Sequence, residues 1–262
     1  MGLRRGLRRN RIDAAEVRND MTWVLLIAAA ALGGLIQTVI GFGAGVVMMT
    51  VFPYLLSITL APTLSTSVCL GVSVPLAWKF RRSINLRLAV WPALLYSLSS
   101  ITAVRTLKHL DLTALTVALG VFLMGLSAYY LFYPTKRVRK KPTVLKMIVF
   151  SLVSGLCGGL FGIGGPLMAV YFLSATEDRQ EYTGCIQLTL SFTSLLNFTM
   201  RAVSGYYTAA MVPMTLLGIA AINAGRWVGL KVGGRIEPDR LRRTIYVFVG
   251  LSGLLTAVRA LL

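Results

Sequence analysis

Gly162-Ile163-Gly164-Gly165-Pro166 interrupts a long apolar run in the second half of the chain, and Gly41-Phe42-Gly43-Ala44-Gly45 interrupts another at a similar place in the first half. Such a break leaves backbone N–H and C=O groups without helical partners. Inside hydrocarbon these groups are tolerated only where they are buried in protein or line a wet cavity. Two breaks at corresponding places therefore predict a shared binding site within a membrane domain.

The composition is that of a protein that crosses a membrane several times. Of the 262 residues, 56% are hydrophobic and 14% are charged, and the mean hydropathy is +0.72. Apolar runs near or above the ~18 residues that mark a membrane helix recur from residue 23 to residue 262. We therefore expect an all-α polytopic membrane protein with about eight transmembrane helices.

The membrane region consists of two duplicated halves. A shift of about 121 or 122 residues places Gly41 on Gly162, Gly43 on Gly164 and Thr66 on Gln187. Each half is expected to begin with a helix broken at its glycines, followed by a short or re-entrant segment, 46–57 or 167–174, that is too short to cross ~30 Å of hydrocarbon. The predicted domains are a basic cytoplasmic N-terminal tail (1–20), a first membrane repeat (21–133), a basic cytoplasmic linker (134–143) and a second membrane repeat (144–262).

The net charge of +18 is divided among short basic segments beside apolar runs: the tail, 79–87, 136–146 and 226–243. Such segments typically face the cytoplasm and contact anionic lipids, and because spans separate them they form no continuous groove for nucleic acid. Eight crossings leave only 226–243 in conflict with this rule. Ten crossings with inverted halves, counted from a cytoplasmic N-terminus, put both 79–87 and 136–146 outside. We therefore prefer eight crossings with a cytoplasmic N-terminus.

No pattern for a familiar catalytic or cofactor site is present. The chain has no Gly-x-x-x-x-Gly-Lys-Ser/Thr, Gly-x-Ser-x-Gly or His-Glu-x-x-His, and no strand precedes the glycine clusters as a dinucleotide site requires. A single histidine, His109, cannot form a usual zinc site. The cysteines lack Cys-x-x-Cys spacing and are predicted to be small apolar residues: Cys69, Cys157 and Cys185. We expect no enzyme activity, no cofactor and no metal.

The placement of charge favours an anion as the bound species. All nine acidic residues lie in tails or connections, and none lies in mid-span, where carriers of cations usually keep a carboxylate. Half-helix N-termini beside Gly43 and Gly164 supply N–H donors and positive dipole ends. Neutral side chains in the spans add further donors, although each has an alternative role in local or interhelix bonding. The predicted substrate-binding residues are Gln37, Gly41, Phe42, Gly43, Thr66, Ser67, Gly162, Ile163, Gly164, Gly165, Gln187, Ser191, Asn223 and Arg226.

Three arginines near span ends have two interpretations each: Arg105, Arg201 and Arg226. Their side chains either extend to the membrane interface or attract anions to the mouth of the site. Arg226, beside Asn223 and Gly225, is the strongest candidate for the second role.

Several stretches carry a family resemblance. They are Gly41-Phe42-Gly43-Ala44-Gly45, 79–82, 155–166 and, in the last third, 225–229 with 235–236 and 241–243. Over roughly residues 25 to 260 the sequence resembles the TauE/SafE sulfite exporter family. It departs from the usual first-half pattern at Ala44, where a glycine is common, and at Val51-Phe52-Pro53, where a Val-Pro-Leu type sequence is frequent.

The resemblance implies a multi-pass protein of the bacterial inner membrane that moves sulfite, sulfonates or related anions such as sulfoacetate, typically outward. Each negative charge that leaves a negative interior gains ~2.3 kcal/mol per 100 mV, so an exporter of anions needs no proton-relay carboxylate. Two alternatives stay open: an accessory membrane subunit that transports nothing, and a sulfur-relay protein that uses the Cys157 or Cys185 thiolate. Assembly as a homodimer is open as well.

Overall fold

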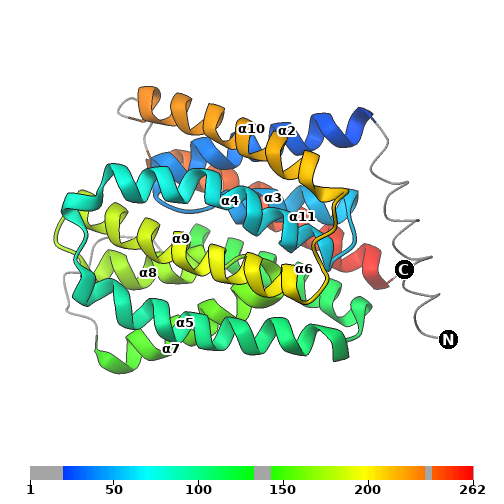
Figure 1. Ribbon diagram of the computed structural model, residues 1–262, viewed down its shortest axis with the longest axis horizontal. Helices are drawn as coiled ribbons and strands as arrows, with labels where there is room; N and C mark the ends of the chain where they lie inside the picture. Colours follow the sequence, from blue (N-terminus) through cyan, green and yellow to red (C-terminus); the bar gives the residue numbers. More distant parts are fainter. Residues whose placement is uncertain (1–19, 133–142, 234–237, 262) are drawn as a thin grey trace.

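The computed structural model describes residues 20–132, 143–233 and 238–261. Within these ranges every regular element is helical (Figure 1). The predicted basic tail, apart from residue 20, and the predicted linker, apart from residue 143, lie outside the described residues.

Each half contributes four long helices and one short helix. The first half holds α2 (Asp20–Ile40), α3 (Ala44–Leu55), α4 (Leu60–Lys79), α5 (Leu86–Thr106) and α6 (Leu112–Phe132), with the single 3-10 turns η1 (Arg81–Ser83) and η2 (Leu107–His109) around α5. The second half holds α7 (Val144–Phe161), α8 (Gly165–Ala175), α9 (Arg179–Val203), α10 (Met211–Val232) and α11 (Pro238–Leu261). Among the described helices, the eight long ones confirm the prediction of about eight spans.

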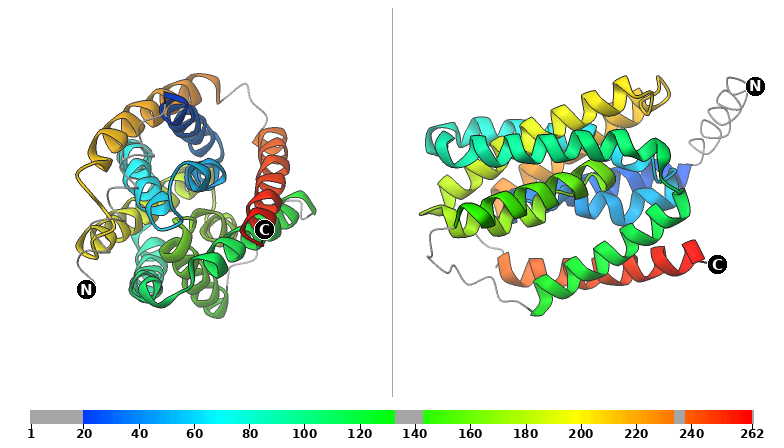
Figure 2. Two further views of the ribbon diagram at one scale, coloured as in Figure 1. Left: turned by 90° about the vertical axis from the view of Figure 1, so that its right-hand side faces the viewer. Right: turned by 90° about the horizontal axis from the view of Figure 1, so that it is seen from below.

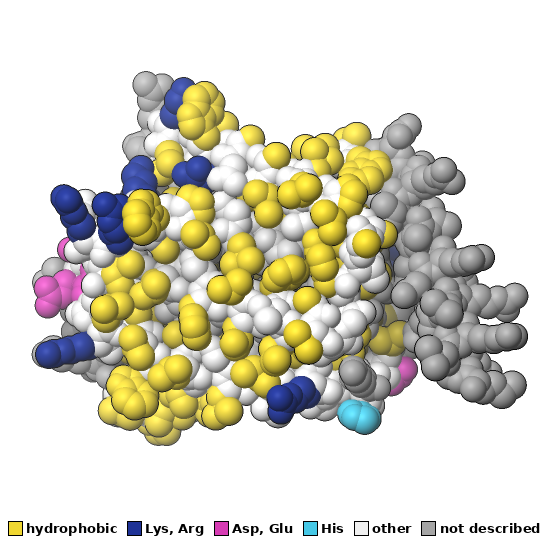
Figure 3. Space-filling model, viewed as in Figure 1, with side chains coloured by type: hydrophobic (Ala, Val, Ile, Leu, Met, Phe, Trp, Pro, Cys, Tyr) yellow, Lys and Arg dark blue, Asp and Glu magenta, His cyan; other side chains and the backbone are white. Residues whose placement is uncertain are grey.

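The outside of the helix bundle is apolar, as a lipid-facing surface must be. Seven of the long helices are apolar enough to cross a membrane. Trp91, Leu98, Leu216 and Leu255 are each more than 60% exposed. Figure 3 shows apolar side chains along the length of the bundle, with most of the Lys and Arg side chains of this face at its left-hand end. The chain is therefore a multi-pass membrane protein.

The central pair of helices is α4 and α9, which pack on each other. The α9 helix is the long helix that is too polar to count as an apolar span, and its polar side chains Gln187, Thr189 and Thr193 are buried. The α4 helix is the most buried of the seven apolar spans. Polar residues in these two helices thus face protein, where hydroxyl and amide groups can find partners.

The two halves pack in the same way. In the first half α2 packs on α3 and on α10, and in the second half α7 packs on α8 and on α5, which are the corresponding elements. The remaining major pair, α6 with α11, joins the last helices of both halves, and Figure 2 shows this pair along one side of the bundle. The contacts therefore support the duplication inferred from the sequence.

The bundle has two ends, which we name after the arginines at the two ends of α9. At the Arg179 end, Asn85 Nδ2 donates to Glu181 Oε1 at 3.1 Å. At the Arg201 end, Arg201 Nη1 contacts Thr59 O at 3.4 Å. In Figure 1 the start of α2 and the end of α11 lie on the right, at the Arg201 end, whereas the end of α6 and the start of α7 lie on the left.

This arrangement corrects the predicted topology. The helices α3 and α8 run back against α2 and α7, so each half reverses direction at every helix and ends on the side opposite to its start. The halves are therefore inverted rather than parallel. The start of α2 lies at the end of the bundle opposite to the end of α6 and the start of α7. The sides that the predicted tail and linker face stay a prediction. The preference for eight crossings treated the short segments as excursions that return to the side they left, whereas α3 and α8 run back along α2 and α7.

Candidate functional site

The two glycine-rich breaks lie against each other in the middle of the bundle. A Cβ atom built on Gly45 would lie 2.7 Å from the carbonyl oxygen of Gly162, so the two backbones are in direct contact. The Phe42 side chain likewise lies 3.4 Å from a Cβ atom built on Gly165. The geometry thus brings the two breaks together, and their role as one binding site stays a prediction.

Each broken helix ends at a glycine with a left-handed backbone. Gly41 follows α2 with φ of 98° and Gly162 follows α7 with φ of 71°, a region that side chains with a Cβ atom rarely adopt. The Gly162 N–H donates to Gly158 O at 2.9 Å, which satisfies a terminal carbonyl of α7. The halves then diverge, since Gly43 has φ of 115° whereas Gly164 has φ of −108°.

Both short helices begin beside the breaks. In α3 the first amide with a backbone acceptor is that of Val47, which donates to Gly43 O at 3.0 Å. In α8 it is that of Met168, which donates to Gly164 O at 3.4 Å. The amides before them belong to the first turn, which has no intrahelical acceptor, and Pro166 has no N–H at all. Each short helix also carries the positive end of its dipole here. Two sources of positive potential therefore meet at one place.

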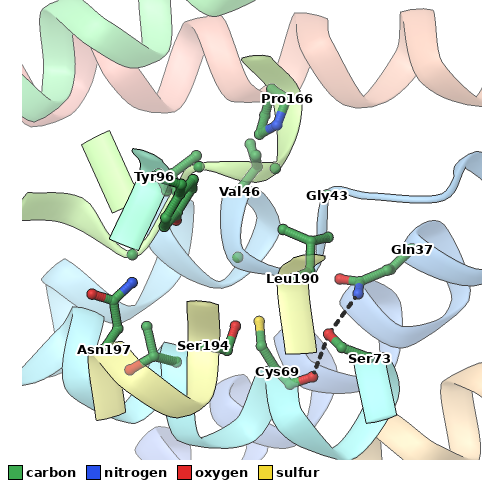
Figure 4. Close-up of a pocket in the computed structure, with 16 residues that line it drawn as sticks. Gln37, Gly43, Val46, Cys69, Ser73, Tyr96, Pro166, Leu190, Ser194 and Asn197 are labelled. Atoms are coloured by element: carbon green, nitrogen blue, oxygen red, sulfur yellow. Dashed lines mark hydrogen bonds between the residues drawn. The ribbon is translucent and has the colours of Figure 1, made fainter. Parts of the chain in front are cut away.

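A small cavity lies between the breaks (Figure 4). Its volume is about 30 Å³, which is close to the room for one water molecule. Its wall combines both breaks with side chains from α2, α4, α5 and α9: Gln37, Gly43, Gly45, Val46, Thr66, Cys69, Ser73, Tyr96, Gly162, Ile163, Gly164, Gly165, Pro166, Leu190, Ser194 and Asn197. The cavity as it stands is small compared with an oxyanion of several heavy atoms.

Of the predicted site residues, seven line this cavity: Gln37, Gly43, Thr66, Gly162, Ile163, Gly164 and Gly165. Three others support the wall from behind. Gly41 and Gln187 are joined by a hydrogen bond, and Phe42 is buried with its ring centroid 5.6 Å from that of Tyr130.

A buried chain of hydrogen bonds holds the first break in place. Gln187 Nε2 donates to Gly41 O at 2.8 Å, Gln37 Nε2 donates to Gln187 Oε1 at 2.9 Å and to Ser73 Oγ at 3.0 Å, and Ser73 Oγ donates to Cys69 O at 2.9 Å. The two backbone carbonyls can only accept, so they fix the direction of every bond and the orientation of both amides. The Oε1 and the Nε2 of Gln187 thus both have partners within the protein, and this side chain holds the first break in position.

The hydroxyl groups predicted to bind substrate donate their protons elsewhere. Thr66 Oγ1 donates to Pro62 O at 2.9 Å, and Ser191 Oγ donates to Gln187 O at 2.7 Å, as hydroxyls in helices commonly do. Among the amides of the wall, Asn197 differs, because its Oδ1 accepts from Ser100 Oγ and its side chain also lies within hydrogen-bond reach of the Tyr96 hydroxyl. Donors near the cavity are therefore backbone N–H groups and the wall side chains of Tyr96, Ser194 and Asn197.

Four predicted site residues lie outside the cavity wall: Ser67, Ser191, Asn223 and Arg226. Ser67 Oγ bonds to Leu64 O at 2.8 Å, and Arg226 Nε donates to Asn223 Oδ1 at 3.0 Å on α10. The neighbouring Gly225 packs on α2, where an added Cβ atom would lie 1.8 Å from Ala31 O. The stretch around Arg226 therefore supports the close packing of α10 on α2.

The family pattern of the sulfite exporter TauE/SafE matches residues 26–256 of this sequence. The chain belongs to this family. Over 157 residues it is also 25% identical to a probable membrane transporter protein of Methanocaldococcus jannaschii, a match that covers 56% of this chain and 58% of that protein. The chain thus spans less than two thirds of the curated relative that it matches. No solved structure matches the chain.

Several wall residues of this TauE/SafE chain were absent from the predicted set. Ser194 and Asn197 follow Leu190 at intervals of four and three residues, the spacing of one helix face, and this periodicity along α9 could have identified them. Tyr96 gave no such signal. A Cβ atom on Gly164 would lie 2.2 Å from its hydroxyl oxygen, so the ring occupies space that glycine leaves open.

The site contains no buried acid. In the part of the chain that the structure describes, Arg201 is the one charged side chain among the buried residues. It is 0% exposed, so the interpretation that it extends to the interface is wrong. Tyr206, in the connection after α9, lies near its charge; burial raises the pKa of this hydroxyl, and the Arg201 charge acts in the opposite direction. Tyr206 is therefore neutral at pH 7 and offers Arg201 no anionic partner.

Among the described residues, no group of three His, Cys, Asp or Glu side chains is close enough together to hold a metal ion. The three cysteines are all buried and unpaired with one another: Cys69, Cys157 and Cys185. Cys69 lines the cavity, whereas Cys157 and Cys185 do not.

Proposed function

We propose that this TauE/SafE protein is a secondary transporter that carries small sulfur-containing oxyanions, such as sulfite, sulfonates or sulfoacetate, out of the cell across the bacterial inner membrane. The observation that carries this proposal is the meeting of two positive helix ends at a cavity without any acidic residue in its wall. Helix N-termini are ready-made anion sites, since their N–H groups and dipoles both favour negative charge. Family membership supports the choice of sulfur oxyanions.

The small size of the cavity is consistent with a carrier rather than an open channel. A space for about one water molecule cannot hold an oxyanion of several heavy atoms. Binding therefore requires the wall to move, and the inverted halves offer two equivalent ways to open it, one toward each end of the bundle. Outward movement of the anion follows the membrane potential, which supplies ~2.3 kcal/mol per charge and 100 mV.

The test compares two leucine variants of asparagine in the purified, full-length protein. Asn197→Leu removes an amide donor from the cavity wall, whereas Asn223→Leu removes an amide on α10 outside it. We expect sulfite to raise the unfolding temperature of the wild type and of Asn223→Leu. The loss of a hydrogen bond to a charged group should weaken binding to Asn197→Leu about 10- to 100-fold.

A panel of sulfite, sulfate, thiosulfate, taurine, sulfoacetate and lactate then ranks the substrates. In proteoliposomes, efflux of the best ligand should accelerate when the interior is made negative. The proposal fails if no oxyanion stabilises the wild type, as an accessory subunit would behave, or if the two asparagine variants respond alike. An efflux rate that does not change with the imposed membrane potential would contradict the proposal that this potential drives export.

A further inference from the structure

Arg201 is a buried charge without a countercharge. Its Nη2 donates to Leu160 O at 3.1 Å and, more closely, to Gly159 O. Its Nη1 makes two long contacts of 3.4 Å each, to Thr59 O and Thr63 Oγ1. Its Nε is buried and has no hydrogen-bond partner. All of these partners are neutral oxygens, and none is a carboxylate.

This arrangement leaves the guanidinium only partly compensated. Arginine remains protonated in proteins and offers five N–H donors, so an unpartnered Nε and two long contacts are an incomplete set. An uncompensated buried charge is strongly destabilising. The carbonyl end of α7 carries a negative dipole and offsets part of this cost, but a pair of anionic oxygens would bind the planar guanidinium more strongly than the neutral carbonyls do.

Arg201 also lies next to the cavity. It follows Asn197, which lines the cavity, by one turn on the same face of α9. Its partners Gly159 and Leu160 end α7 directly before the second break at Gly162. A single side chain therefore connects the cavity wall, the end of the broken helix α7 and the start of α4.

The other end of α9 has a comparable contact. Arg179 Nη2 donates to Val39 O at 2.9 Å, near the end of the broken helix α2. Arg179 is exposed, whereas Arg201 is fully buried. Each broken helix thus has an arginine at its carbonyl end, but only Arg201 is held away from water with part of its donor capacity unused.

We propose that Arg201 is a second binding station for the transported oxyanion, at the end of the cavity nearest α7. An anion that reaches this station replaces the Gly159 and Leu160 carbonyls as partner of the guanidinium, which frees the end of α7 and opens the second break toward the Arg201 end. The proposal rests on the proposed transport of oxyanions, since it assigns a residue and an exit step to that same site.

The experiment measures sulfite binding to the purified full-length protein by calorimetric titration, with the unfolding temperature recorded without sulfite. Arg201→Lys keeps the charge but loses the planar fork, and Arg201→Gln loses the charge. We expect sulfite affinity to fall about tenfold or more in Arg201→Lys and further in Arg201→Gln. Arg105→Lys, an exposed arginine at the same end, should bind sulfite as the wild type does.

The outcomes separate the two proposals. If the wild type binds none of the oxyanions, the transport proposal fails, whatever the variants do. If the wild type binds sulfite and Arg201→Lys binds it equally well, Arg201 only stabilises the fold and the station is refuted. The lysine variant decides the matter even where Arg201→Gln does not fold. A lower unfolding temperature with unchanged sulfite affinity also counts against the station.

Discussion

The contact between the two breaks can be tested by adding one methyl group, as Gly45→Ala. The nearest atom to the new Cβ is Gly162 O at 2.7 Å, while the next neighbours, Ser65 Oγ and Cys69 Sγ, lie at 3.8 and 3.9 Å. An ordinary contact begins near 3.4 Å, so the two backbones must separate by about 0.7 Å. Overpacking of this kind costs about 1–3 kcal/mol, and the better helix propensity of alanine offsets up to about 1 kcal/mol.

The assay is thermal unfolding of the purified protein, with and without sulfite. For a chain of this size, a net loss of about 1–2 kcal/mol lowers the unfolding temperature by roughly 3–6 °C. Gly125→Ala is the matched control, because a Cβ atom at this helical position of α6 meets no atom within 4 Å. The control should be neutral or slightly stabilising. The reasoning is refuted if Gly45→Ala is as stable as Gly125→Ala and binds sulfite as tightly.

Three further predictions follow from the described contacts. Gln187→Leu leaves Gly41 O and a Gln37 N–H without partners, so it should cost about 2–4 kcal/mol of unfolding free energy, measured by thermal unfolding; a loss below 1 kcal/mol contradicts the network. Replacement of Cys69, Cys157 or Cys185 by serine should leave sulfite efflux near the wild-type rate, because a transporter does not need a thiolate. Loss of efflux in any of these variants would support a sulfur relay. In a cysteine-free chain, impermeant maleimides should label Ser83→Cys, in the connection after α4, and Ala209→Cys, in the corresponding connection after α9, from opposite sides of the membrane; labelling of both from the same side contradicts the inverted halves.

The fold could be predicted from the sequence as far as local physics determines it. Long apolar runs give the number of long helices, and the glycines mark where α2 and α7 end because left-handed backbone at Gly41 and Gly162 stops a helix. The direction of α3 and α8 could not be predicted. A helix of 12 or 11 residues is consistent with a re-entrant loop that rejoins the side where α2 or α7 ended. It is equally consistent with a helix that runs back toward the side where α2 or α7 began. Only the packing of α3 on α2 and of α8 on α7 decides between these two arrangements.

The parts of the candidate site that the glycine breaks form could be predicted from the sequence. The side chains that face it could be predicted less well, because their hydrogen-bond partners depend on tertiary contacts. The breaks, Gln37 and Thr66 lie where the duplicated pattern placed them. Asn223 and Arg226 looked equally polar in the sequence, yet they bond to each other on α10. Conversely, Arg201 stands near the end of a span, where an extended side chain at the interface is the ordinary expectation. Its burial follows from the tertiary contact of α9 with the ends of α7 and α4.

The inverted halves change which basic segment conflicts with the positive-inside rule. The basic segment 79–87, Lys146 at the start of α7 and the arginines Arg240, Arg242 and Arg243 at the start of α11 all lie at the Arg179 end of the bundle. A single orientation, with the Arg179 end in the cytoplasm, satisfies the positive-inside rule for all three segments. It leaves the start of α2 on the opposite side, so the conflict passes to the basic segment 4–18 that precedes α2 in the sequence. With this orientation Arg201 lies toward the outside, so the station that we propose there is the last one that an exported anion would meet.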